Sequence, residues 1–365
     1  MTVAIAGAAE CDLGQTGLSV PELLTQAVSR ALDDAGLSLS DVDGLATTGH
    51  GRFPATQLAD YLGLHPVWTD STSAGGAVFE MYVARAAQAI EAGQCHVAVI
   101  AFASDQRSAR SRRMTGEPNR FSDPYQPLWP LSYYAMVAQR YLYTYRLGRA
   151  DLAQQAVWAR QRALLNPAAW THTQGALTVQ DVLDAPLISS PLGKLDCCLV
   201  TDGGGAIVLT SLDRARHLRQ RPVLVRGYGE VVTHAEMTSA EDLLYPGAAA
   251  AGAQAFARAG MSHRDIDVLQ IYDSFTISVP LALEQLGFCP PGEGAAWSGL
   301  PMNTGGGGLA YCHPGQLGVL LLVEAVRQLR GQCGARQVPD ARTALVHGTG
   351  GIMSSHATVI LEAAA

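Results

Sequence analysis

The order of apolar segments along the chain is typical of layered α/β proteins. An amphipathic stretch over residues 77–91 predicts a helix, and the apolar run at 96–101 predicts the buried strand that follows it. The same order returns near the C-terminus, with a helix predicted at about 317–329 and a strand at 343–347. Helices that alternate with buried strands indicate an α/β fold.

One segment of this pattern is repeated. Residues 31–45 (ALDDAGLSLSDVDGL) resemble residues 255–269 (AFARAGMSHRDIDVL) at a separation of 224 residues. In each copy a helix ends at a glycine, Gly36 or Gly260, and a turn with aspartate leads into an apolar strand. The repeat predicts two homologous halves.

We place these halves at residues 1–220 and 221–365. The first half carries an insertion at about 105–195 that is rich in Arg, Tyr and Trp and is predicted to hold helices at about 132–146 and 150–164. Because insertions over a two-lobed core usually shape a substrate pocket, we expect the insertion to cover the site.

Composition narrows the class of protein. The 365 residues are 48% hydrophobic and 16% charged, which predicts a globular chain with a large core. A net charge of −7 argues against nucleic acid or an anionic membrane as the partner. The seven cysteines show no Cys-x-x-Cys spacing, so neither a disulfide framework nor a zinc site is predicted. With no signal-peptide pattern and no apolar run of about 18 residues, we expect a cytoplasmic protein that neither is exported nor spans a membrane.

The 38 glycines gather in three clusters, 203–205, 305–308 and 348–351. Glycine is favoured where the backbone needs positive φ or close approach to a ligand. No cluster matches the phosphate-binding patterns of ATP or dinucleotide sites, so neither cofactor is predicted.

Short motifs spread over nearly the whole chain carry a family resemblance. In order they are Asp70-Ser71-Thr72-Ser73-Ala74-Gly75-Gly76, Leu164-Leu165-Asn166-Pro167, Thr201-Asp202-Gly203-Gly204-Gly205-Ala206, Tyr272-Asp273-Ser274-Phe275, Asn303-Thr304-Gly305-Gly306, His313-Pro314-Gly315 and Gly348-Thr349-Gly350-Gly351. Together they resemble the thiolase superfamily, in the branch of sterol-carrier-protein-x thiolases, lipid-transfer proteins and thiolase-like aldolases. The resemblance implies a five-layered αβαβα fold, a homodimer and a small OB-fold, zinc-ribbon partner protein. It also implies coenzyme A as part of the substrate, with no tightly bound cofactor and no metal in this chain.

Ser73 stands where classical thiolases place a cysteine nucleophile at the start of the long helix. A serine hydroxyl needs a base in contact before it can attack a thioester. Ser73 is therefore either an acyl acceptor with a neighbouring base or a residue that caps the helix.

The family's second cysteine is also replaced. The His-Asp-Cys-Phe motif of sterol-carrier-type thiolases reads Tyr272-Asp273-Ser274-Phe275 here, and Ser274 is a poor substitute for a cysteine acid and base. Thiolase-like aldolases carry a similar Tyr-Asp-x-Phe motif. Tyr272 is thus a candidate acid and base, or alternatively a core tyrosine with a bonded hydroxyl.

Two alignments compete for the third catalytic position. In the aldolases a second tyrosine precedes a histidine, which resembles Tyr311, whereas the Gly-His-Pro motif of thiolases aligns with His313. The two alignments differ by two residues and both stay open. His347 precedes the last glycine cluster and is a candidate to hold an enolate oxygen or to act as an acid, or else a buried structural histidine.

Further residues are expected to bind the substrate. Asn303 is placed to orient a water or His313, although Asn-Thr-Gly-Gly also makes a good turn. Gly306 and Gly350 lie in loops that border the pantetheine tunnel and oxyanion holes of the family, and Ser274 is expected beside them. Arg113, in the basic run of the insertion, is a candidate for the CoA phosphates, as an alternative to a solvated surface loop.

Three functions follow in order of preference. The first is retro-aldol or aldol chemistry at the α–β carbon–carbon bond of a β-hydroxyacyl-CoA or carrier-protein thioester, which needs no cysteine nucleophile. The second is Claisen-type acyl transfer through Ser73, with His313 as its base. The third is a non-catalytic thiolase-like scaffold that binds acyl-CoA or lipid and supports a partner enzyme.

Overall fold

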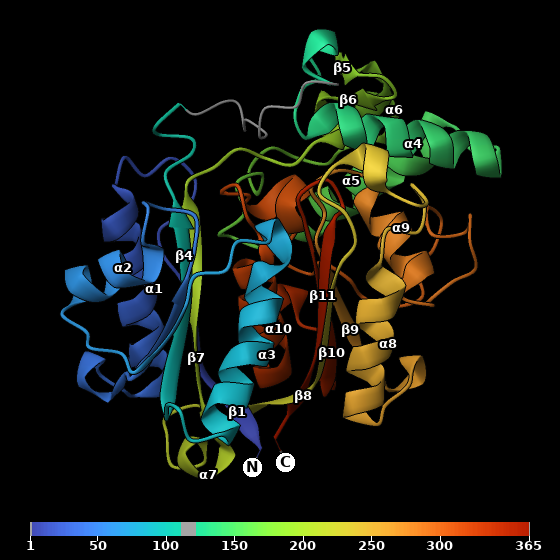
Figure 1. The fold of residues 1–365 in the computed structure, drawn as a ribbon. Helices are drawn as coiled ribbons and strands as arrows, with labels where there is room; N and C mark the ends of the chain where they lie inside the picture. The colour runs from blue at the N-terminus through green and yellow to red at the C-terminus, as the bar shows by residue number, and fades with distance from the viewer. Residues whose placement is uncertain (1, 111–121, 365) are drawn as a thin grey trace.

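Two half-sheets joined edge to edge form the core of the computed structural model, which describes residues 2–110 and 122–364 (Figure 1). The strand order is β3-β2-β4-β7-β1 in the first half-sheet and β8-β11-β10-β9 in the second. They meet where β1 pairs with β8 over two positions, Ala4 with Leu224 and Ile5 with Val223. The strands are β1 (Val3–Glu10), β2 (Gly44–Thr47), β3 (Trp68–Asp70), β4 (Val97–Ser104), β7 (Gly203–Ser211), β8 (Val223–Val232), β9 (Val268–Ile271), β10 (Thr343–Gly350) and β11 (Ser355–Ala363).

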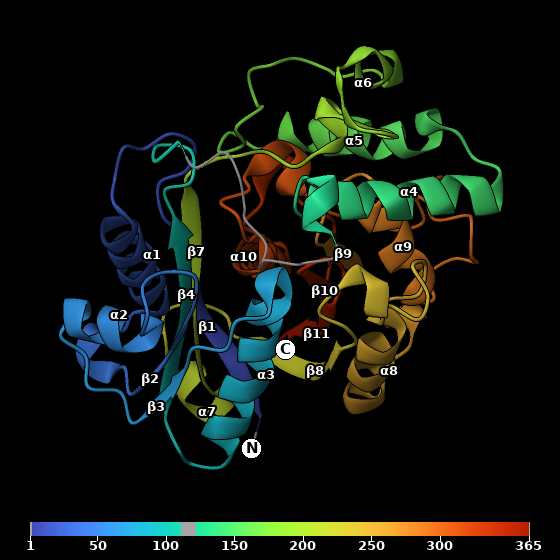
Figure 2. The same ribbon diagram turned by 45° about the horizontal axis from the view of Figure 1, so that its top comes forward.

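The helices complete five layers. Helices α1 (Val20–Ala35) and α2 (Pro54–Leu62) cover the outer face of the first half-sheet, and α8 (Ala248–Ala259) covers that of the second (Figures 1 and 2). Between the half-sheets lie α3 (Val78–Glu91) and α10 (Gly318–Arg330), which contact strands of both. The predicted αβαβα architecture is confirmed.

The sequence repeat corresponds to a structural repeat. Helices α1 and α8 both end at a glycine with left-handed backbone, Gly36 at φ 75° and Gly260 at φ 64°. A single 3-10 turn follows in each half, at Leu39–Asp41 and at His263–Asp265, and leads into β2 and β9. The short helix α7 (Leu212–Ala215) lies between the last strand of the first half-sheet and the first strand of the second, close to the predicted boundary.

The insertion lies across one end of the sandwich, at the top of Figure 1. Its described α-helices and strands are α4 (Leu131–Tyr145), α5 (Arg149–Ala163), α6 (Val179–Asp184), β5 (Leu187–Ser189) and β6 (Leu192–Gly193). Helix α9 (Ser278–Gln285) and the π-helix η7 (Gly307–Tyr311) lie beneath it. The predicted helices match α4 and α5 within one residue. The chain therefore closes this end of the core with α4 and α5.

The inner helices begin side by side at this end. A side chain on Gly318, the first residue of α10, would lie 2.7 Å from the carbonyl oxygen of Gly76, just before α3. Glu80, in the first turn of α3, is 1% exposed and packs against both Gly318 and Gly348 of β10. Neither carboxyl oxygen of Glu80 has a hydrogen-bond partner among the described residues. Burial therefore raises the pKa of Glu80 well above its ordinary value of 4.5.

The raised pKa of Glu80 predicts a pH-dependent cost to stability. Unfolding returns the carboxyl to its ordinary pKa and releases a proton above about pH 4.5, so the native state loses stability as pH rises towards the folded pKa. Glu80→Gln removes this titration. We expect the melting temperature of Glu80→Gln minus that of wild type to be larger at pH 8 than at pH 5. The increase should be about 2–4 °C for each kcal/mol of stability that the substitution restores.

Glu324→Gln is the matched control for this measurement. Glu324 is also buried, but it accepts hydrogen bonds from Thr304 at 2.7 Å and from Arg336 at 3.0 Å. Its loss should lower the melting temperature at both pH values because it breaks satisfied contacts. A Glu80→Gln difference that stays constant between pH 5 and pH 8 would contradict the assignment.

Candidate active site

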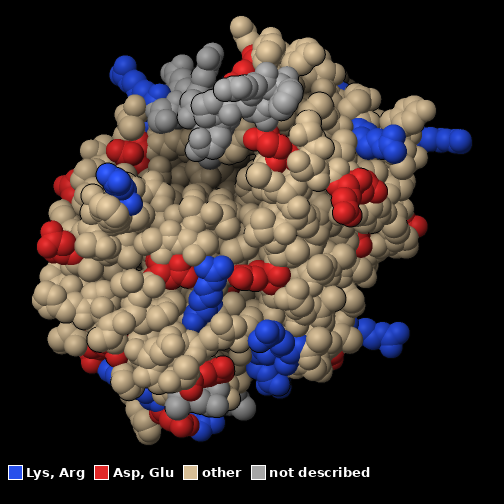
Figure 3. All heavy atoms as spheres, viewed as in Figure 1, with Lys and Arg blue, Asp and Glu red and all other residues tan. Residues whose placement is uncertain are grey.

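A cavity of about 470 Å³ lies at the N-terminal ends of α3 and α10, beneath the start of α4. In the space-filling view the surface is hollowed above the start of α3 (Figure 3). The lining comes from the turn before α3, the segment after β9, the turn before α10, the turn between β10 and β11, and the insertion. Its residues are Ser73, Ala74, Gly75, Gly76, Trp129, Pro130, Tyr134, Cys198, Val232, Tyr272, Ser274, Phe275, His313, Gly315, Gln316, Thr349, Gly350, Gly351, Ser354 and Ser355.

Tyr272 and His313 form the centre of this cavity. The Tyr272 hydroxyl lies 3.1 Å from Nε2 of His313, and the two rings meet edge to face with centroids 5.7 Å apart. The backbone N–H of Leu317, at the start of α10, donates to the Tyr272 oxygen at 3.3 Å. The phenol therefore bridges an imidazole and a helix N-terminus, two groups that favour transfer of its proton.

Burial keeps both partners neutral. It raises the pKa of Tyr272 well above 10, an effect that the Leu317 N–H partly offsets, and it lowers the pKa of His313 from 6.5 to about 4. At neutral pH the pair is thus a phenol beside an uncharged imidazole, in the arrangement of a proton donor and its acceptor.

Ser73 lines the cavity without a base. It is exposed at the rim, and no hydrogen bond joins its hydroxyl to another described residue. Neither α3 nor the 3-10 turn before it (Gly75–Ala77) has a side-chain cap, so the helix-capping alternative is wrong. The structure shows no activating contact between Ser73 and His313.

A turn of bare backbone forms one wall of the cavity. Gly75 has φ +61°, and a Cβ on it would lie 2.6 Å from the backbone nitrogen of Gly351 and 2.9 Å from Cα of Gly350. Side chains are therefore excluded at this approach of two backbones, which brings the start of α3 against the last glycine cluster. Backbone N–H groups that face such a cavity are suited to a thioester oxygen.

Two catalytic candidates lie outside the cavity lining. Tyr311 ends the π-helix and lies near Glu10 and Arg327, away from the Tyr272 hydroxyl. His347 is fully buried in β10, where Nδ1 contacts Thr358 at 2.9 Å and Nε2 contacts His356 at 3.4 Å. Of the two competing alignments, the geometry favours the one that places His313 at the family's histidine position.

The residues predicted to bind substrate also fall into two groups, those that line the cavity and those that do not. Gly350 and Ser274 line the cavity, whereas Gly306 packs against Ala163 of α5. Asn303 uses its side chain on the backbone of Ile271, accepting from its N–H at 2.7 Å and donating to its carbonyl at 2.9 Å. Asn303 thus fixes the strand end that presents Tyr272. Arg113 lies outside the described residues.

The structure adds side chains that sequence reasoning had not assigned to the site. Tyr134 of α4 and Cys198 both face Tyr272, and Trp129 lines the same cavity. Asp273 is buried behind them, accepts from the N–H groups of Gly308 at 2.6 Å and Leu309 at 3.2 Å, and has its pKa raised to about 7 by burial. The aromatic content of the insertion was the one signal in the sequence that pointed to Trp129 and Tyr134.

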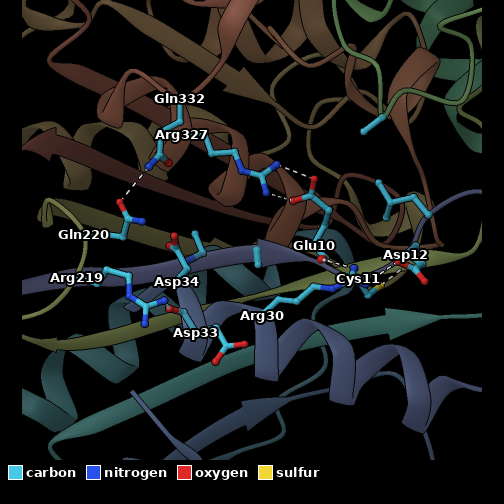
Figure 4. A pocket seen from close by; sticks show the side chains of 14 residues that line it. Glu10, Cys11, Asp12, Arg30, Asp33, Asp34, Arg219, Gln220, Arg327 and Gln332 are labelled. Carbon is cyan, nitrogen blue, oxygen red and sulfur yellow. Dashed lines mark hydrogen bonds and ion pairs between the residues drawn. The ribbon is translucent and has the colours of Figure 1, made fainter. Parts of the chain in front are cut away.

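A second cavity, of about 780 Å³, lies between the halves (Figure 4). Four of its charged side chains pair with one another: Arg327 with Glu10, and Arg30 with Asp12 at 2.7 Å. Gln332 bonds Gln220 at 3.1 Å, and Arg219 reaches the carbonyl oxygen of Asp33. Since most of these polar groups are already paired, we assign the chemistry to the smaller cavity with its Tyr272–His313 pair.

Comparison with known proteins agrees with the fold. Residues 229–363 match the family described as thiolase C-terminal domain-like. The chain is 34% identical to a 17-hydroxy-3-oxo-4-pregnene-20-carboxyl-CoA lyase of Mycobacterium tuberculosis, over 90% of this chain and 91% of the relative. It is 33% identical to a steroid side-chain-cleaving aldolase of Thermomonospora curvata, over 96% of each chain. The solved Ltp2-ChsH2(DUF35) aldolase superposes with a TM-score of 0.89 at 31% identity, covering 99% of this chain and 98% of that one.

The fold, the site and these relatives define an enzyme of the thiolase superfamily. The chain belongs to that superfamily, in its branch of thiolase-like aldolases. The preference for retro-aldol chemistry over acyl transfer is thereby confirmed at the level of the family. None of the helices in the described ranges combines the length and apolar character that a membrane span requires.

The lowered pKa of His313 can be measured directly. We expect the ring to stay neutral down to about pH 5 in an NMR titration and to protonate near pH 4, with His313→Gln identifying its resonance. Because the unfolded chain takes up this proton first, His313 lowers stability as pH falls from 6.5 towards 4. A midpoint at the ordinary value of 6.5 would show that the site is wetter than the structure indicates.

Proposed function

We propose that the protein cleaves the α–β carbon–carbon bond of a β-hydroxyacyl-CoA thioester by a retro-aldol reaction. The products are a ketone and a shorter acyl-CoA. The observation that carries the proposal is the Tyr272–His313 pair, buried in a cavity whose helix start holds Ser73 without a base. A retro-aldol step needs a proton acceptor for the β-hydroxyl and a place for the enolate charge, and it needs no covalent nucleophile.

Tyr272 and His313 remove the proton. The β-hydroxyl of the substrate gives its proton to the Tyr272 oxygen as the phenol passes its own proton to Nε2 of His313. The Cα–Cβ bond breaks, its electrons move into the thioester enolate, and Cβ becomes the ketone carbon. An imidazolium is disfavoured in this buried place, so His313 holds the proton only while the enolate exists.

The close approach of Gly75 to Gly350 and Gly351, which we call the glycine wall, holds the thioester. The backbone of Gly75, Gly350 and Gly351 lines the cavity, and in this proposal its N–H groups receive the carbonyl oxygen. Donors fixed in a dry site stabilise developing charge without reorganisation, so this wall is suited to the enolate oxygen. Coenzyme A enters as part of the substrate, and Ser274 and Gly350 contact its acyl end.

The acyl group is bulky and ring-shaped in this proposal. Trp129 and Pro130 from the insertion, together with Phe275, give the cavity apolar and aromatic lining. One similar protein is a lyase of 17-hydroxy-3-oxo-4-pregnene-20-carboxyl-CoA and another is a steroid side-chain-cleaving aldolase. These names support a polycyclic substrate with the β-hydroxyl on the ring. Aromatic walls suit such a substrate because they bury a large apolar area.

We further propose a cytoplasmic homodimer that works with a small OB-fold, zinc-ribbon partner. Strand β3 (Trp68–Asp70) is the outer strand of the first half-sheet and pairs on one side with β2, which leaves an edge for a second copy. The similar solved aldolase contains a ChsH2(DUF35) component, which supports a partner of that kind.

Cleavage of 17-hydroxy-3-oxo-4-pregnene-20-carboxyl-CoA tests the reaction, with the ketone and the shorter acyl-CoA measured by mass spectrometry. Tyr272→Phe should lower kcat by about 10²- to 10⁴-fold because it removes the hydroxyl that relays the proton. Ser73→Ala should keep turnover, since no acyl-enzyme forms.

Two results would replace the proposal. An acyl group found on Ser73 by intact-protein mass measurement would establish acyl transfer. Binding of the thioester without turnover, by a chain with its partner present, would favour the scaffold. Full activity of Tyr272→Phe would remove the assigned proton relay.

A further inference from the structure

The proposed reaction needs a second proton-transfer group. After the carbon–carbon bond breaks, the enolate carbon must receive a proton, and the Tyr272–His313 pair is engaged with the β-hydroxyl. Of the three other candidates from the sequence, Tyr311 and His347 lie outside the cavity lining and Ser73 has no contact that would help it move a proton. The remaining acids among the described lining residues are Tyr134 and Cys198.

Tyr134 reaches the cavity from the insertion. It lies near the start of α4, is 2% exposed, and packs its ring against that of Phe275 at an angle of 39°, with centroids 4.5 Å apart. Its hydroxyl points to the glycine wall, where the carbonyl oxygen of Gly351 is 3.5 Å away, at the limit of a hydrogen bond. Packing against Phe275 accounts for the ring, and the Gly351 carbonyl is only a weak acceptor for the proton of the hydroxyl.

The surroundings of the Tyr134 hydroxyl favour its release of a proton. Burial raises the pKa of Tyr134 to about 12, while the Ser274 hydroxyl and the Met353 backbone lower it. Both are donors that would stabilise a transient phenolate. Cys198 is less favourable, because burial and the negative groups around it raise the pKa of its thiol well above 9 and only a backbone hydrogen bond opposes them.

Position separates the two phenols. Tyr272 is bound to His313 and to the start of α10, whereas Tyr134 faces the last glycine cluster, where the thioester would lie. A substrate whose carbonyl rests on the glycine wall presents its α-carbon to Tyr134 and its β-hydroxyl to Tyr272.

From this geometry we propose that Tyr134 is the catalytic acid that protonates the α-carbon of the enolate, an inference that rests on the proposed retro-aldol function. The Tyr134 O–H bond breaks as the Cα–H bond forms, and the enolate electron pair becomes that new bond. The phenolate left on Tyr134 and the proton held by His313 are then neutralised through water, so the enzyme returns to its starting state.

Hydrogen exchange tests Tyr134 apart from cleavage. The reverse of its step removes an α-proton from the product, so wild-type enzyme in D₂O should exchange the α-hydrogens of propionyl-CoA for deuterium, as read by NMR. Tyr134→Phe should lower this exchange by about 10²- to 10⁴-fold, the usual contribution of general acid–base catalysis. Tyr272→Phe should lose cleavage but keep exchange, because its proton belongs to the β-hydroxyl.

Tyr133→Phe is the matched control, since Tyr133 is the preceding residue of α4, is 8% exposed and does not line the cavity. Cleavage, exchange and melting temperature should all stay at wild-type values in this variant. Exchange by Tyr134→Phe at the wild-type rate would overturn the inference, and so would loss of exchange in Tyr272→Phe alone. A wild-type enzyme that neither cleaves the thioester nor exchanges would overturn the proposed function as well, whereas cleavage without exchange in wild type would overturn the inference alone.

Discussion

The approach of α3 and α10 at their N-terminal ends is the constraint on which the rest of this structure depends. Gly76 and Gly318 leave no side chain between the two helix starts, so both N-termini come to the same point of the core. The Tyr272 ring lies against Gly76, and its hydroxyl accepts from Leu317 at the start of α10. A larger residue at Gly76 or Gly318 would separate the helices and displace the phenol from its donor. The glycine excess of the chain is therefore partly a consequence of building a site between two buried helix ends.

This position also explains the charge state of the site. Glu80, Tyr272 and Asp273 all have raised pKa values and His313 a lowered one, each chiefly because burial disfavours the charged form. At neutral pH, Glu80, Tyr272 and His313 are thus uncharged before the substrate enters, whereas Asp273, with a pKa of about 7, is partly charged. Charge appears when the enolate forms, and it appears next to fixed N–H donors. Such a site suits a reaction that moves protons and creates a transient anion better than one that needs a resident thiolate.

Much of the fold follows from local signals in the sequence. Gly36 and Gly260 end α1 and α8 where the repeat predicts helix ends, and a capping box of Ser19 and Glu22 begins α1. These features depend on residues within a few positions of one another. The joining of the half-sheets at Ala4 and Leu224 could not be predicted in this way, because it depends on packing between segments that lie 220 positions apart.

The site was harder to predict than the fold because its residues come from different elements and their positions depend on local backbone geometry. Tyr311 and His313 are two positions apart, and the choice between them depends on a π-helix that ends at Tyr311, a rare element without a hydrophobic period of its own. The extended backbone of Cys312 then brings His313 to Tyr272. Tyr134 could not be predicted for a different reason. In the sequence it is one of several aromatic residues on an amphipathic helix, and nothing distinguishes it from the others. Tyr133 and Tyr141 of that helix pack in the core and Tyr143 is exposed, so the direction of α4, set by its packing on the second half, decides which tyrosine meets the substrate.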